Sequence, residues 1–117
     1  MFDIKPVVLQ ALDSIPGVTV SDAYPSDWAK LPHISFYEVA NSDHLRLGQE
    51  VLTEVNIQVD VWHTQSTGAI AQQVDQALRN IGLRRAFSAD IPDPSGVKHK
   101  TMRYRSLVNK RTNLVHQ

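Results

Sequence analysis

Apolar and polar residues alternate over a long stretch near the middle of the chain, EVLTEVNIQVDVWHTQS, residues 50–66. Alternation with a period of two is typical of a β-strand that covers a core with one face. One face carries the mostly β-branched residues Val51, Thr53, Val55, Ile57, Val59 and Val61. The other face carries Leu52, Glu54, Asn56, Gln58, Asp60 and Trp62. These residues span roughly 40 Å, about twice the usual strand length, so we expect the strand to project beyond its core.

Two further segments show the three-and-four spacing of apolar residues that is typical of an amphipathic helix. The first runs from Asp3 to Ile15, where Asp3 can act as N-cap and a proline falls in the first turn. The second begins after a cap at Ser66 or Thr64 and ends before Gly82, which suits the position after the C-cap. Both helices are expected to cover the β-branched face of the long strand.

Shorter strands are expected on both sides of this unit. A short strand at residues 18–21 precedes a second strand at 33–40, and the polar, turn-rich segment 41–49 joins that strand to the long one. Two strands connected in this way predict a β-hairpin with a long tip.

The second half of the chain predicts a closing strand pair. Residues 83–90 and 96–109 alternate around the turn sequence IPDPSG, and residues 110–117 read as a loose C-terminal tail. The order of elements predicts one α+β domain over residues 1–109, with a mostly antiparallel β-sheet, a long β-hairpin and two helices packed on one face.

Composition narrows the class of protein. The 117 residues suffice for one domain, and 42% hydrophobic with 21% charged residues is typical of a globular chain. No apolar run reaches about 18 residues, and the N-terminus lacks the basic region and cleavage site of a secretory signal. Without cysteine there is no disulfide framework and no thiolate zinc site. These features favour a protein that folds in cytoplasm.

The charges are distributed unevenly, although the formal net charge is zero. Residues 1–60 carry nine acidic and three basic side chains, and residues 61–117 carry three acidic and nine basic ones. Halves of opposite sign would suit head-to-tail self-association, because the basic surface of one copy can meet the acidic surface of the next. The alternative is that the two halves interleave in the fold and their charges mix.

Residues with catalytic chemistry do not form a recognisable motif. Glu54 and Asp60 share a strand face but lie about 20 Å apart, too far for paired acid–base catalysis. No serine has the Gly-x-Ser-x-Gly context of a nucleophile elbow, and no glycine-rich phosphate loop is present. The histidines are scattered without metal-ligand spacing: His33, His44, His63, His99 and His116. We therefore expect neither an enzyme nor a bound metal or cofactor.

A basic series in the second half requires comparison with nucleic-acid sites. Its members are Arg84, Arg85, Lys98, Lys100, Arg103 and Arg105. Alternation places Arg103 and Arg105 on one strand face with His99 and places Tyr104 on the opposite face, so no base-stacking platform results. A solvated face or a subunit contact is favoured over a specific nucleic-acid site.

Five stretches together resemble the tail-completion, or tail-terminator, proteins of long-tailed bacteriophages, a family that includes head-to-tail joining proteins. These stretches are LPHISFYEV, the polar tip NSDHLRLGQ, the long strand EVLTEVNIQVDVWHTQST, the helix AIAQQVDQALRNIG and the closing strand HKTMRYRSLVN. The resemblance extends from the N-terminal helix to about Asn109. It rests on the order of elements and on a few typical residues such as Val61 and Trp62.

The resemblance implies a structural virion protein that forms a ring, commonly a hexamer, at the head-proximal end of the tail. Such a ring ends the tail tube, docks to the connector proteins of the head and leaves a channel through which DNA passes without specific contacts. The protein would reside in the virion, in the tail or neck, and in host cytoplasm during assembly, with no membrane contact. The alternative is a small-molecule- or nucleic-acid-binding α+β domain of a non-phage protein, which leaves the long strand unexplained.

By the same analogy, the hairpin and the polar strand face form a contact with a neighbouring subunit, the tail tube or the connector. The residues assigned to it are Asp43, His44, Leu45, Arg46, Leu47, Glu54, Asn56, Gln58 and Asp60. The basic residues assigned to an interface or to the channel are Arg84, Arg85, Arg103 and Arg105.

Overall fold

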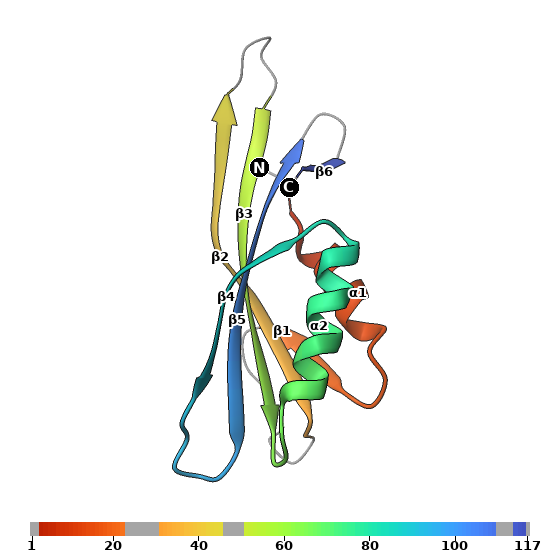
Figure 1. The fold of residues 1–117 in the computed structure, drawn as a ribbon. Helices are drawn as coiled ribbons and strands as arrows, with labels where there is room; N and C mark the ends of the chain where they lie inside the picture. Colours follow the sequence, from red (N-terminus) through yellow and green to blue (C-terminus); the bar gives the residue numbers. More distant parts are fainter. Residues whose placement is uncertain (1–2, 23–30, 46–50, 110–113, 117) are drawn as a thin grey trace.

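A six-stranded sheet with both helices on one face forms the fold, which confirms the α+β class (Figure 1). The computed structural model describes residues 3–22, 31–45, 51–109 and 114–116. In chain order the elements are α1 (Lys5–Asp13), β1 (Thr19–Asp22), β2 (His33–Leu45), β3 (Val51–His63), α2 (Gly68–Asn80), β4 (Arg84–Ile91), β5 (Lys98–Asn109) and β6 (Leu114–His116).

The strands lie in the order β1-β2-β3-β5-β4, and β6 pairs with β5. Strand β1 is parallel to β2, whereas every other described pair is antiparallel. The two expected hairpins, β2–β3 and β4–β5, are present, and the long central strand has its predicted length. Figure 1 shows that the paired ends of β2 and β3 extend past both helices, as the length of the stretch predicted.

The prediction of a hairpin tip at residues 41–49 is wrong for residues 41–45. Strand β2 continues to Leu45, with Asn41 opposite Val55 and Leu45 opposite Val51. The polar side chains of this segment suggested a turn, but an antiparallel ladder needs only backbone donors and acceptors, and β3 supplies them throughout. Residues 46–50, the rest of the expected tip, lie outside the described part of the chain.

The C-terminal segment differs from the expected loose tail. Residues 114–116 form strand β6, which pairs with Leu107–Asn109 of β5. The neighbouring strand β4 pairs with β5 only as far as Arg105, so the remaining backbone groups on that side of β5 are open to another strand. The unpaired backbone groups of β5 determine the conformation of this segment. Its own composition gives no sign that such a pairing partner exists.

The core lies between the β-branched face of β3 and the two helices, as the alternation predicted. Side chains with no exposed surface include Val8, Leu12, Val55, Ile57, Val59, Val61, Val74 and Leu78. Full burial of one such side chain contributes about 1.5–3 kcal/mol to folding. Strand β5 adds Met102, Tyr104 and Val108 to the same core, the face that alternation assigned to them.

The helix starts differ in detail from the predicted caps. The N-cap of α1 is Ile4, and the Asp3 carboxylate accepts a hydrogen bond from the backbone N–H of Lys5 at 3.1 Å. The N-cap of α2 is Thr67, while the Ser66 hydroxyl accepts a hydrogen bond from the Gly68 N–H at 3.3 Å. The predicted capping side chains therefore do bond near both helix starts, but from the residue before the N-cap.

The end of α2 follows the prediction. Gly82 has a φ of 93°, a conformation that favours glycine. Its N–H bonds to the Arg79 carbonyl at 3.0 Å, and the Leu83 N–H bonds to the Leu78 carbonyl at 2.9 Å. This pair of bonds is a Schellman motif, and it turns the chain directly into β4. Across the residues that the structure describes, no helix is long and apolar enough to span a membrane.

Candidate functional site: the open face of the sheet

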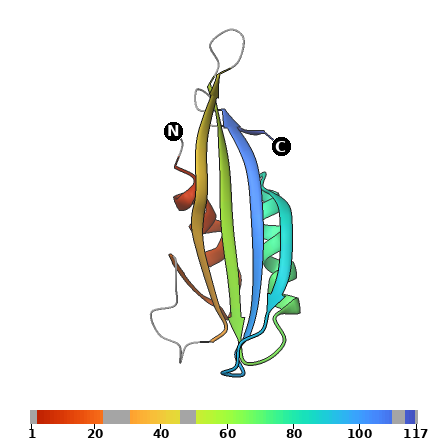
Figure 2. The same cartoon turned by 90° about the vertical axis from the view of Figure 1, so that its left-hand side faces the viewer.

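The face of the sheet that points away from the helices has no covering layer of helices or strands in the described structure, and we call it the open face (Figure 2). The strand register assigns its side chains. They include His33, Ser35 and Tyr37 of β2, Glu54, Asn56, Gln58, Asp60 and Trp62 of β3, His99, Thr101, Arg103 and Arg105 of β5, and Arg84, Phe87, Ala89 and Ile91 of β4.

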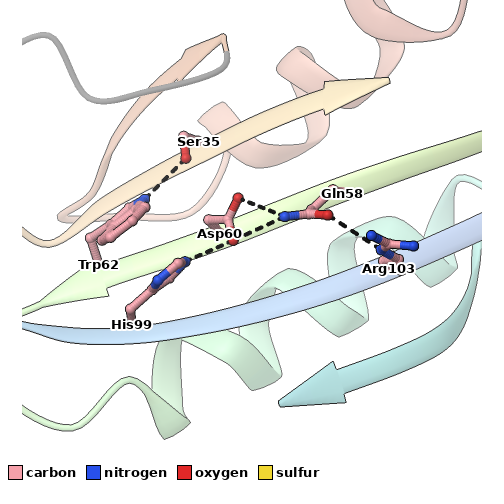
Figure 3. Close-up of polar contacts among 6 residues, drawn as sticks. All are labelled: Ser35, Gln58, Asp60, Trp62, His99 and Arg103. Carbon is pink, nitrogen blue, oxygen red and sulfur yellow. Dashed lines mark hydrogen bonds and ion pairs between the residues drawn. The ribbon is translucent and has the colours of Figure 1, made fainter. Parts of the chain in front are cut away.

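A stacked pair of rings anchors one end of the open face. The Trp62 indole and the His99 imidazole lie 3.6 Å apart between centroids, at an interplanar angle of 15°. The indole Nε1–H donates to the Ser35 hydroxyl at 3.0 Å, so this contact joins β2, β3 and β5 (Figure 3). Trp62 is only 6% exposed, although none of the described helices covers it.

A chain of polar contacts continues from this stack along the face (Figure 3). The His99 Nε2 lies 2.8 Å from Asp60 Oδ1. The Gln58 amide N–H donates to Asp60 Oδ2 at 3.3 Å, and the Arg103 Nε–H donates to Gln58 Oε1 at 3.3 Å. Each of these side chains contacts the next one in the row. The contacts fix the side-chain rotamers and make this part of the open face a preorganised polar surface.

Asp60, which the analogy assigned to a contact surface, is almost fully enclosed within the subunit. Its side chain is only 7% exposed, because His99 and Gln58 enclose it. Glu54 is more open, with 30% of its side chain exposed, and its Oε1 lies 3.7 Å from Arg105 Nε. The polar face of β3 therefore has a closed end near Trp62 and an open end near Glu54.

The four arginines assigned to one basic site do not share a surface. Arg84, Arg103 and Arg105 lie on the open face, as the pairing of Arg84 with Arg105 shows. Arg85 is opposite the buried Tyr104 on the helix side, and one of its guanidinium nitrogens lies 3.8 Å from Asp75 Oδ1. Adjacent residues of a strand point to opposite faces, so a run of two arginines cannot supply one face with both.

The charge asymmetry of the chain does not produce separate acidic and basic surfaces here. The acidic strand β3 is hydrogen-bonded to the basic strand β5, which places Glu54 near Arg105 and Asp60 near His99. Within β4–β5, Lys100 Nζ lies 3.0 Å from Asp90 Oδ1. In these strands the acidic and basic halves of the chain interleave and their charges mix, which was the alternative to head-to-tail association.

Of the hairpin residues assigned to an interface, only the strand portion can be placed. The backbone of Asp43, His44 and Leu45 forms the end of β2. Arg46 and Leu47 lie outside the described residues.

A second polar cluster joins β1 to β2 at the edge of the open face. The Ser21 hydroxyl lies 2.7 Å from His33 Nε2, and the Thr19 hydroxyl contacts the other ring nitrogen, Nδ1. His33 is 4% exposed, and its burial lowers the pKa of the imidazole below the ordinary value of 6.5. The fold therefore favours the neutral ring.

The lowered pKa of His33 predicts a loss of stability in mild acid. Because the imidazole binds a proton more weakly in the folded state, its contribution is fully present above about pH 6.5 and is lost as the pH falls through the folded-state pKa. We expect the unfolding midpoint to drop between pH 7.5 and pH 5, and to drop less in His33→Asn. Urea titrations at both pH values measure this. An equal drop in wild type and variant would contradict the assignment to His33.

His99 is the histidine of the polar chain, and its contacts show which groups it can act on. The His99 imidazole contacts Asp60 and Trp62, and no serine or threonine hydroxyl of the described chain is bonded to it. The same described residues contain no group of three metal-ligating side chains. Sequence reasoning missed the Trp62–His99 stack, although alternation had placed Trp62 with Asp60 and His99 with Arg103. The missing information was which strands are neighbours.

A comparison with protein families identifies a match over most of the chain. The family described as Tail completion protein gp17 matches residues 7–109, a range that contains all of β1 to β5, both hairpins and the open face. No curated protein matches the chain.

Proposed function

Because the chain belongs to the tail completion protein gp17 family and so has a structural role in phage tails, we propose that it forms a ring at the head-proximal end of the tail. The ring ends the tail tube and joins it to the connector proteins of the head. A hexamer is the expected ring size, and residues 1–109 form its single domain. The protein resides in the virion after assembly in host cytoplasm, and this role requires neither catalysis nor a cofactor.

The observation that carries the proposal is the length of the β2–β3 hairpin. Each strand has 13 residues, and the pair extends past the helices that cover its lower part (Figure 1). A strand pair that only closed a core of this size would end with the helices. The projecting part gives each subunit an arm with which to contact the tube, the connector or the next subunit.

The open face supplies the polar contacts of the proposed ring. The side chains of Glu54 and Arg105 are 30% and 65% exposed, and Gln58 and Asn56 lie beside them on β3. We place Arg103 and Arg105 towards the channel, where guanidinium groups contact passing DNA through its phosphates, without sequence specificity. The preorganised chain from Ser35 to Arg103 holds this surface in one shape.

The experiment uses tubes grown from the tail tube protein of the same phage. Gold-labelled protein, viewed by electron microscopy, is expected at one end of each tube only. Added during growth, it is expected to stop elongation, so the mean tube length falls as its concentration rises. Labelling along the tube wall, or tubes of unchanged length, would contradict termination. Connectors added afterwards are expected at labelled ends, and unlabelled tubes are the control.

A further inference from the structure

Two apolar features lie on opposite edges of the subunit. On the β4 edge, Phe87 projects from the open face with 50% of its surface exposed. On the opposite edge of the sheet, formed by β1 and β2, a recess of about 260 Å³ is lined by Pro6 and Leu9 of α1 and Phe36 of β2, together with Asp3 and Lys5. Leu9 is 40% exposed. Figure 2 shows α1 beside β2 at one edge and β4 at the other.

Each apolar feature has a charged neighbour, and the two charges are opposite. Glu38 follows Phe36 by two residues on the same face of β2, and its Oε2 atom is buried without a hydrogen-bond partner. Arg84 precedes Phe87 on the open face, because a bulge between Arg85 and Phe87 absorbs one residue. In the described part of the chain, Arg84 makes no ion pair. A buried carboxylate oxygen without a partner is costly, so it calls for a donor.

The two apolar features also lie at nearly the same level along the strand direction. Phe87 is opposite Arg103, which is opposite Gln58, which is opposite Tyr37, so Phe87 lies within one residue of the level of Phe36. Strand β4 is antiparallel to β2, so the direction from Arg84 to Phe87 equals the direction from Glu38 to Phe36. A rotation about an axis along the strands therefore brings both pairs together without translation. Rotation without translation is the operation that can close a ring, whereas an added translation builds a filament.

We propose that the β4 edge of one copy packs on the α1–β2 edge of the next, with Phe87 in the recess and Arg84 on Glu38. This rests on the proposed ring and assigns its subunit contact. Phe87 points away from the helices, whereas the recess lies on the helix side. The open face of one copy at β4 therefore lies over the helix side of the next copy at α1 and β2. Both edges carry β-bulges, at residues 38–40 and 85–87, which disfavour a continuous sheet across the contact. Side chains make the contact.

The absence of cysteine from the chain allows a direct test. A double variant, Phe87→Cys with Leu9→Cys, is bound to tail tubes of the same phage and treated with a short bismaleimide. Denaturing gels are expected to show a ladder of covalent oligomers up to the ring size, whereas each single variant stays monomeric. A covalent dimer from Phe87→Cys alone would mean that like edges meet, which overturns the proposal.

Electron microscopy of the same samples separates the two proposals. Rings on the tubes without a ladder from the double variant would overturn this contact and leave the ring intact. Tubes without rings in the wild type would overturn the proposed function, and this contact with it.

A second test uses matched surface variants. Phe87→Ser is expected to reduce ring occupancy on tubes at least tenfold while the subunit stays folded. Val7→Ser, which removes an apolar residue of α1 that is 37% exposed and outside the recess, is expected to assemble as wild type. Arg84→Glu and Glu38→Arg are each expected to weaken assembly and, combined in one chain, to restore it. Equal occupancy for Phe87→Ser and Val7→Ser would contradict the contact.

Discussion

Replacement of Trp62 by alanine is expected to lower the free energy of unfolding by about 3–5 kcal/mol, the range for truncation of a large buried aromatic side chain. The indole is 6% exposed, stacks on His99 and donates to Ser35. Its removal opens a void on the open face and leaves the ring of His99 and the side chain of Asp60 accessible to water. The loss extends beyond one side chain, because the polar chain that begins at this stack loses its anchor.

Urea unfolding measured by circular dichroism tests this expectation. Phe87→Ala is the matched control, since Phe87 lies on the same sheet face but is 50% exposed, and its loss should cost only about 1 kcal/mol. Equal destabilisation by the two variants would show that the open face does not bury Trp62. The pair also separates fold from assembly, because Phe87→Ala should impair the ring while the subunit stays folded.

The second large effect is expected in α1, where Leu12→Ala should cost about 2–5 kcal/mol. Leu12 has no exposed surface and belongs to the core cluster that faces the sheet. With only 9 residues, α1 is too short to be stable alone and depends on that packing. We expect the variant to lose much of the helix at urea concentrations that leave the wild type folded.

Leu9→Ala is the control for this variant, because it is the same substitution in the same helix at a residue that is 40% exposed. It should cost about 1 kcal/mol in stability. It should nevertheless weaken the ring, since Leu9 lines the recess that receives Phe87. Destabilisation of both variants to the same extent would contradict the packing of α1 on the sheet through its Leu12 face.

Local patterns in the sequence predicted the elements that packing against one core requires. The alternation from Val51 to Trp62 predicted a long strand with one face towards the helices, and the apolar spacing predicted both helices. Gly82 predicted the end of α2, because the left-handed backbone conformation that ends a helix is adopted most readily by glycine. Each of these signals is contained within a few residues, so it can be detected without knowledge of the neighbours.

The misjudged segments are those whose conformation depends on a distant partner. Residues 41–45 look like a turn but form a strand, since β3 offers them a complete ladder. Residues 114–116 look like a loose tail but pair with the part of β5 that β4 leaves vacant. Hydrogen bonds between strands join residues far apart in the sequence, and composition carries no record of them.

The amino-acid pattern was sufficient to predict the fold class, the two faces of the long strand and the lack of a catalytic motif. The three-dimensional fold was needed to show which face each arginine joins, that His99 and Gln58 enclose Asp60, and that Phe87 lies level with the recess on the opposite edge. The difference lies in how far along the chain the interacting residues are separated. Periodicity reflects burial of one local face, whereas neighbouring strands, their register and their bulges are fixed by backbone pairing across the whole sheet.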